Sequence, residues 1–366
     1  MEEGKETEKK RFLKKILLII NCIIQIGGTC GAPLVARLYF LHGGHRVWLS
    51  SFVQASGFPI LLIPLSISYI RRRRNYNRNR VTTVATKPKI FTMKLPLFIV
   101  FTVVGLLQGL DNILYSKGLA SLPVSTASLI ISTQLAFTAI FAFLLVRQKF
   151  TPYSLNAIMM LILGAVILAL NGAGDGPAGE SPKTYVMGFI LTIIAAALIG
   201  FILPLVELAY KKTNQTINYT LVLEIQLVAS FSSALFSLVG MFINNDHKVV
   251  SREAKNFDLG ETIYCVVLVA SAIFSQLSGL GAMGVVFCAS SLMSGIMVAM
   301  TVPLTEILAV IFYKEKFQAV KGISLVLSIW GFISYFYGEY QQTKKMKKNS
   351  IKENEQPQNP NNINYV

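Results

Sequence analysis

Ten apolar segments, each long enough to cross a lipid bilayer as a helix, make up most of this sequence of 366 residues. A helix needs about 20 mainly apolar residues to span the hydrocarbon layer, where its backbone polar groups find no water. Only 14% of the residues are charged and 53% are hydrophobic, whereas a soluble domain usually carries about 25% charged residues. The sequence therefore predicts an all-α membrane protein with ten transmembrane helices, at residues 16–36, 47–70, 95–117, 122–146, 153–171, 185–210, 219–243, 262–280, 283–313 and 318–340.

The basic residues lie between the apolar segments. The formal net charge is +16, and one dense basic run is Arg71–Arg74. If both termini are cytoplasmic, as an even number of crossings permits, most basic residues fall on the inner side, as the positive-inside rule prefers. The charge therefore indicates topology and contact with membrane lipid, and no nucleic-acid partner is expected. We expect residues 1–15 to form a cytoplasmic N-terminal segment and residues 341–366 to form a disordered cytoplasmic tail.

A short internal similarity divides the apolar part of the chain into two halves. The run Arg147-Gln148-Lys149-Phe150 returns 167 residues later as Lys314-Glu315-Lys316-Phe317. A repeat with an odd number of crossings returns upside down, and inverted repeats are typical of alternating-access carriers. We therefore predict two inverted five-helix repeats, residues 16–171 and 185–340, with a site between them near the membrane midplane. Chance similarity between two short basic turns is the alternative.

Charged side chains within the predicted spans are few and acidic. They are Asp111, Glu207, Glu224 and Glu306, and no Lys or Arg lies deep in a span. Charged groups at that depth usually face a wet cavity or a partner. A carrier of phosphates or nucleotide-sugars would need buried cations, whereas carboxylates suit neutral or cationic solutes and protons. Glu207 stands four residues before Lys211, which favours an interfacial ion pair.

Asp111 is the first candidate for proton coupling. Gln108, Asp111, Asn112 and Tyr115 are spaced so that they share one face of a helix. Burial disfavours the charge of a carboxylate, so Asp111 can take up and release a proton as the cavity opens to either side. A structural hydrogen bond to a neighbouring helix is the alternative.

Other acidic and amide residues complete the predicted site. Glu224 and Glu306 are the further candidates for proton coupling: no basic residue at helical spacing neutralises Glu224, and Glu306 follows Pro303 by three residues. Carboxamides both donate and accept hydrogen bonds, as the edge of a heterocycle requires. The predicted substrate-binding residues are Gln134, Gln108, Asn112, Tyr115 and Gln226. We find no enzymatic, metal-ligand or cofactor motif in the sequence, so we expect neither enzyme activity nor a cofactor.

Longer stretches resemble the plant purine permease family, within the drug/metabolite transporter superfamily. The similarity runs from about residue 20 to residue 338 and includes Leu122–Thr138, Gly200–Glu207 and Pro303–Phe317. It implies the ten-helix fold of drug/metabolite transporters. It also implies an importer of adenine-like bases and related heterocycles, including cytokinins, by symport with protons. The plasma membrane is the implied location, with an internal membrane as the alternative, and no obligate protein partner is evident.

Two other functions stay open. Some members of the family take up nicotine-like or benzylisoquinoline alkaloids, so the cargo is not fixed by the resemblance. A membrane receptor could bind such ligands without moving them. A nucleotide-sugar or phosphate exchanger is disfavoured, because the spans lack buried cations.

Overall fold

The computed structural model describes residues 2–79, 89–122, 127, 130–131, 133–148, 150–172, 182–314 and 319–355. Within these residues every regular element is a helix, which agrees with the predicted all-α class. Seven helical segments in the described part of the chain are long and apolar enough to cross a membrane. They are Phe12–Leu41, Val47–Arg78, Leu95–Ser121, Val186–Lys212, Tyr219–Ile243, Glu261–Cys288 and Ser291–Tyr313.

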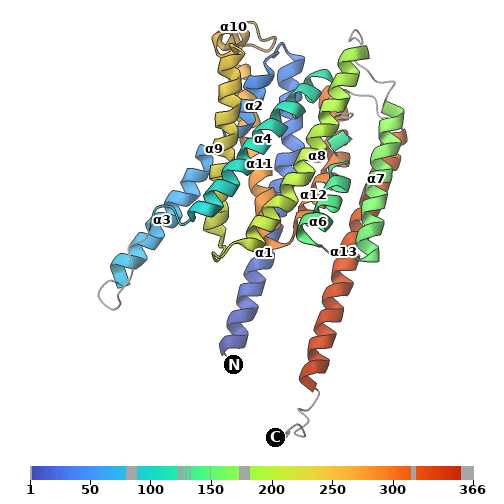
Figure 1. Cartoon of the computed structure of the whole chain (residues 1–366). Coiled ribbons are helices and arrows are strands. Elements are labelled where there is room, and N and C mark those ends of the chain that lie inside the picture. Colours follow the sequence, from blue (N-terminus) through green and yellow to red (C-terminus); the bar gives the residue numbers. More distant parts are fainter. Residues whose placement is uncertain are drawn as a thin grey trace, which may run out of the picture.

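The helices form one elongated bundle (Figure 1). In chain order they are α1 (Glu2–Leu41), α2 (Val47–Ala55), α3 (Pro59–Asn79), α4 (Leu95–Ser121), α6 (Gln134–Val146), α7 (Pro152–Gly172), α8 (Pro182–Lys212), α9 (Tyr219–Ile243), the 3-10 helix η1 (Asp246–Lys248), α10 (Val250–Lys255), α11 (Glu261–Cys288), α12 (Ser291–Tyr313) and α13 (Ala319–Glu355). The start of α1 and the end of α13 lie at the same end of the bundle, and α10 lies at the opposite end (Figure 1).

The second predicted span, residues 47–70, is not one continuous helix. It breaks into α2 and α3, because the Ser56 hydroxyl bonds back to the backbone of α2 and Pro59, which has no N–H to donate, begins α3. Gly57 lies in the break and touches α11, where an added Cβ would come within 2.5 Å of the Ala272 carbonyl oxygen. The chain therefore turns where it meets a distant helix.

The predicted boundary near residues 280–283 was also wrong. The helix α11 continues through Gly281, where an added Cβ would lie 2.5 Å from the backbone nitrogen of Gln25. The true start of α12 follows Ser290, whose hydroxyl accepts a hydrogen bond from the Met293 N–H at 3.2 Å. This is an ordinary serine N-cap.

The predicted disordered tail differs from the structure as well. The helix α13 continues through Glu355, so residues 341–355 are helical. Residues 356–366 of that predicted tail lie outside the described part of the chain. Most of the predicted N-terminal segment, 1–15, belongs to α1, which begins at Glu2.

The most extensive helix contacts join the two halves of the sequence. The helix α1 packs along α11, α4 packs along α8 and α9, α6 packs along α8, α2 packs along α9, and α7 packs along α13. The core between α4, α8 and α9 is fully buried and includes Phe101, Val104, Ile202, Val206 and Ile225. Within the described residues, the larger hydrophobic cores therefore combine side chains of both halves.

Small residues let α1 and α11 approach closely. A Cβ added to Gly28 would lie 2.2 Å from the backbone nitrogen of Ser278 and 2.7 Å from the Phe274 carbonyl oxygen. A Cβ added to Gly284 would lie 2.0 Å from Oδ1 of Asn21. Glycines at such contacts are a usual way for membrane helices to bring their backbones together. We call this contact the α1–α11 seam.

A buried polar cluster ties α10 to the turn between α1 and α2. One carboxylate oxygen of Glu253 accepts hydrogen bonds from the hydroxyls of Tyr39 at 2.5 Å and Tyr264 at 3.3 Å. The other oxygen pairs with Arg46 Nε at 3.6 Å, and Arg46 Nη1 reaches Asp246 Oδ1 at 3.5 Å. One arginine therefore neutralises two buried carboxylates at the end of the bundle far from the termini.

We expect the substitution Arg46→Met to lower the thermal stability of the protein, because it leaves the buried Asp246 and Glu253 without their cation. Removing one member of a buried ion pair costs about 3–5 kcal/mol. The Arg46 side chain is 36% exposed, so solvent screening reduces the expected loss to about 1–3 kcal/mol. Thermal unfolding of the purified protein in detergent measures it. His42→Ala, which removes an exposed pair with Asp258, should change stability by less than about 0.5 kcal/mol; equal losses in the two variants would contradict the prediction.

Candidate functional site

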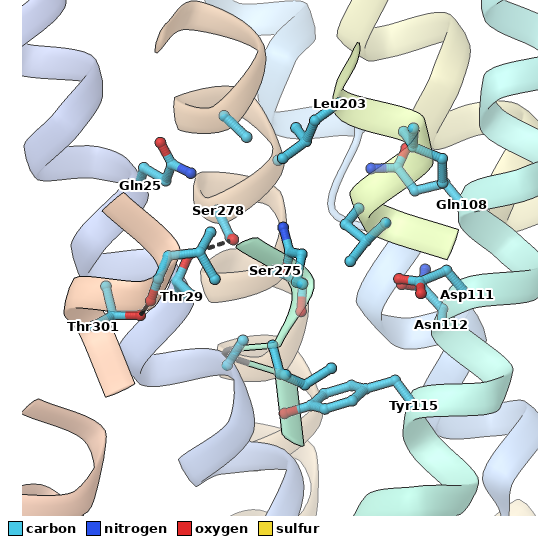
Figure 2. Close-up of a pocket in the computed structure, with 18 of the residues that line it drawn as sticks. Gln25, Thr29, Gln108, Asp111, Asn112, Tyr115, Leu203, Ser275, Ser278 and Thr301 are labelled. Atoms are coloured by element: carbon cyan, nitrogen blue, oxygen red, sulfur yellow. Dashed lines mark hydrogen bonds between the residues drawn. The ribbon is translucent and has the colours of Figure 1, made fainter. Parts of the chain in front are cut away.

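A cavity of about 200 Å³ lies between helices of both halves. It is smaller than the ~300–1,000 Å³ pockets that hold drug-sized ligands, so it suits a small one. The polar side chains of its wall come from six helices, and several of them are drawn in Figure 2. The polar residues of the wall are Gln25 and Thr29 of α1, Gln54 of α2, Gln108, Asp111, Asn112 and Tyr115 of α4, Gln134 of α6, Ser275 and Ser278 of α11, and Thr301 and Thr305 of α12. The helix α8 also contributes to the wall, and its residues there are apolar.

The helix α4 contributes the four residues that the sequence placed on one helical face. Gln108, Asp111, Asn112 and Tyr115 all line the cavity (Figure 2). The amide nitrogen of Asn112 donates to Ser233 Oγ of α9 at 3.3 Å. Gln108 Oε1 and Asp111 Oδ1 are buried with no hydrogen-bond partner among the described residues. A buried polar atom without a partner costs about 1–3 kcal/mol, so these atoms indicate where a ligand or water binds.

Gln134 faces the same cavity from α6. It is the first residue of that helix, its side chain is only 3% exposed, and its Nε2 has no hydrogen-bond partner among the described residues. The helix α8 lies close to the backbone of Gln134. A Cβ added to Gly200 would lie 3.1 Å from the Gln134 carbonyl oxygen. Gln134 therefore belongs to the cavity wall, and its role in substrate binding stays a prediction.

Glu224 and Gln226 do not line the cavity, unlike the placement predicted from sequence. Both lie near the start of α9, where Glu224 Oε2 accepts hydrogen bonds from the backbone N–H groups of Thr92 at 2.9 Å and Met93 at 3.0 Å. This carboxylate therefore holds the chain just before α4. Gln226 donates to Ser230 Oγ, one turn along its own helix, at 3.0 Å.

Glu207 and Glu306 are the other two acidic residues of the predicted spans. Glu207 pairs with Lys211 at 2.7 Å, so the predicted ion pair is confirmed. Its second oxygen accepts hydrogen bonds from the Ser291 N–H at 2.7 Å and hydroxyl at 2.5 Å, at the start of α12. Glu306 lies in α12, but its side chain falls outside the described part of the structure, so its role in proton coupling stays a prediction.

Sequence reasoning missed the contribution of α1 and α2 to the cavity. Gln25 and Thr29 stand four residues apart in an apolar span, and this helical spacing was the available signal. Gln54 likewise follows Ser50 by four residues, and its amide nitrogen donates to Ser50 Oγ at 3.3 Å. The same nitrogen also donates to Ser116 Oγ of α4 at 2.8 Å, a contact between residues distant in the sequence.

Ionisable side chains are rare in the cavity wall. Asp111 is the one ionisable carboxylate among the residues that line the cavity, and no Lys or Arg belongs to that lining in the described part of the chain. An unbalanced negative charge would repel phosphate groups and attract cations or protons. The wall therefore favours neutral or cationic ligands.

Comparison with known proteins places this chain among transporters. A family model described as purine nucleobase transmembrane transport matches residues 16–345. The chain belongs to the purine permease family. The permease is 50% identical over 345 residues to purine permease 3 of Arabidopsis thaliana, covering 93% of this chain and 97% of that relative. It is 52% identical over 346 residues to purine permease 2 of the same plant, covering 92% of this chain and 95% of the relative.

The family assignment confirms the resemblance seen in the sequence. The permease is an integral membrane protein, and its relatives are permeases rather than enzymes. A solved structure titled only "Crystal structure of protein" has a similar fold, with a TM-score of 0.56 at 15% identity over 86% of this chain and 97% of that chain. At that identity the likeness concerns the fold alone.

Proposed function

We propose that this permease imports purine bases and related heterocycles, such as adenine and cytokinins, together with protons, by alternating access. The observation that carries the proposal is the cavity between the two halves of the bundle. Its wall combines one carboxylate with several buried amide atoms that have no hydrogen-bond partner among the described residues. The family and the printed names of the relatives support a purine base as the cargo.

The unpaired atoms of the wall suit a flat heterocycle. Gln108 Oε1 can accept a hydrogen bond, and Gln134 Nε2 can donate one. A purine base offers both kinds of group around its edge. Tyr115, which also lines the cavity, offers an aromatic face on which such a ring can stack. We propose Gln134, Gln108, Asn112 and Tyr115 as the substrate-binding residues.

We propose Asp111 as the proton-coupling residue. It lines the cavity with one oxygen unpaired, so a proton can bind there without breaking a hydrogen bond of the protein. Glu224 is less suitable, because both of its oxygens accept hydrogen bonds from Thr92. Glu306 stays a second candidate.

We further propose that ten helices cross the membrane as two inverted five-helix repeats, residues 16–171 and 185–340. In this scheme α1, α4, α6 and α7 correspond to α8, α11, α12 and α13, and α2 with α3 corresponds to α9. The contact of α1 with α11 then has its counterpart in α8 with α4, and that of α6 with α8 in α12 with α1. These matched contacts support the scheme.

A local feature supports the same repeat. Arg147 directly follows α6 and Lys314 directly follows α12, and these two residues stand 167 positions apart. Both adopt the left-handed backbone conformation, with φ of 51° and 52°, which is uncommon for residues other than glycine. We propose that both termini are cytoplasmic and that the plasma membrane is the location. In support, the start of α1, the end of α13 and the basic end of α3 lie toward the same end of the bundle (Figure 1).

Uptake of labelled adenine into cells that lack their own purine carriers tests the proposed function. We expect uptake that rises at acidic external pH, is blocked by a protonophore, and is inhibited by unlabelled trans-zeatin. Stronger inhibition by nicotine than by trans-zeatin would favour alkaloids as the cargo. Binding of adenine at the cell surface without concentrative uptake would indicate a receptor and contradict the proposal.

A further inference from the structure

Gln25 has one half of its amide fixed by the protein and the other half unused. The side chain lies on α1, is fully buried at 0% exposure, and belongs to the cavity wall. Its Nε2 donates to Ser294 of α12, to Oγ at 2.8 Å and to the carbonyl oxygen at 3.2 Å. Its Oε1 has no hydrogen-bond partner among the described residues.

The contacts with Ser294 determine which end of the amide is free. A backbone carbonyl oxygen can only accept hydrogen bonds, so the Gln25 atom beside it must be the amide nitrogen. A reversed amide would bring two oxygen atoms to 3.2 Å from each other with no hydrogen between them. Gln25 therefore has a free hydrogen-bond acceptor, and no free donor beyond its bonds to Ser294.

A second amide on α1 shows what a purely structural role looks like. Asn21, one turn earlier, donates to the Leu17 carbonyl oxygen at 2.7 Å and accepts from the Tyr219 hydroxyl at 3.0 Å. Both ends of its amide are satisfied, and it is not part of the cavity wall. Gln25 is equally buried, but it belongs to the cavity wall and keeps an acceptor free.

We propose that Gln25 is a specificity-determining residue, whose Oε1 accepts a hydrogen bond from the exocyclic amino group of the bound base. The inference rests on the proposed function. Gln25 lies across the cavity from Gln108 and Asp111 (Figure 2), so a flat base between them is contacted on two edges. A 6-amino purine offers two N–H groups to Gln25. A 6-oxo purine offers an oxygen instead, which would leave two acceptors facing each other.

The substitution Gln25→Met tests the proposal, because methionine keeps the length of the side chain and removes the acceptor. The assay is inhibition of labelled adenine uptake by unlabelled adenine and by unsubstituted purine, which lacks the 6-amino group. We expect Gln25→Met to weaken the apparent affinity for adenine about 5- to 100-fold, the range for a buried donor left without its acceptor. The affinity for unsubstituted purine should change far less.

The matched control is Asn21→Leu, which disturbs a buried amide on the same helix but should affect adenine and purine equally. Equal effects of Gln25→Met on the two ligands would overturn the proposal and assign Gln25 a structural role.

If Gln25→Met does not reach the membrane, Ser294→Ala replaces it. The loss of the anchoring hydroxyl should reduce the preference for adenine over purine, and an unchanged preference would overturn the proposal. Failure of the unsubstituted permease to take up adenine would instead refute the proposed function and this inference with it.

Discussion

The Asp111→Asn variant is expected to move its substrate across the membrane but not to concentrate it. Asparagine is nearly isosteric with aspartate and retains hydrogen-bonding capacity, but it cannot take up and release a proton. Because Asp111 lines the cavity with an unpaired oxygen, the substitution should remove the link between the proton gradient and the cargo while leaving the site open. Accumulation should fall to the level of cells treated with a protonophore, and exchange of labelled for unlabelled substrate should persist.

The control for this variant is Glu224→Gln, which changes another buried carboxylate of the spans. Glu224 lies outside the cavity wall and supports the backbone at Thr92 and Met93. We expect this substitution to lower the amount of folded protein while the acid stimulation of uptake per molecule is retained. Uphill uptake by Asp111→Asn at the normal rate would exclude Asp111 from proton coupling. Loss of acid stimulation in Glu224→Gln alone would transfer the role to Glu224.

The second large effect is expected at the α1–α11 seam. In Gly28→Val the new side chain would overlap the backbone of α11, because even a Cβ would lie 2.2 Å from the Ser278 nitrogen. A backbone cannot move aside as a flexible side chain can, so the two helices must separate. Overpacking in a core typically costs about 1–3 kcal/mol, and we expect this backbone overlap to reach or exceed the upper end of that range.

Gly27→Val provides a matched control, since a Cβ at the neighbouring glycine would meet nothing within 4 Å. Replacing a helical glycine in open space should change stability by less than about 1 kcal/mol. The yield of monodisperse protein in detergent and its thermal unfolding measure both variants. Equal yields of the Gly27→Val and Gly28→Val proteins would contradict the close contact between α1 and α11.

The spacing of residues along the chain predicted the features that involve a single helix. The spacing of Gln108, Asp111, Asn112 and Tyr115 placed them on one face of α4, and the structure places all four in the cavity wall. The break between α2 and α3 could not be predicted in the same way. Its position depends on the approach of Gly57 to α11, a contact between residues far apart in the chain.

The same limit applies to the buried amides and carboxylates. Asn21 and Gln25 are both polar residues of one apolar span, and only their distant partners, Tyr219 and Ser294, show which of the two keeps an atom free. Glu224 appeared suited to a cavity because no basic residue lies near it on α9. Its actual partners, Thr92 and Met93, belong to the segment before α4.

The α1–α11 seam also bears on how such a carrier can move. Two helices that touch backbone to backbone at Gly28 and Gly281 cannot slide past each other without forcing side chains into the positions that the glycines leave empty. We therefore expect them to travel as one rigid piece while the cavity changes the side to which it opens. Because α1 comes from the first half of the sequence and α11 from the second, each moving piece would be assembled from both halves. Residues 1–172 alone would then hold only fragments of the moving pieces.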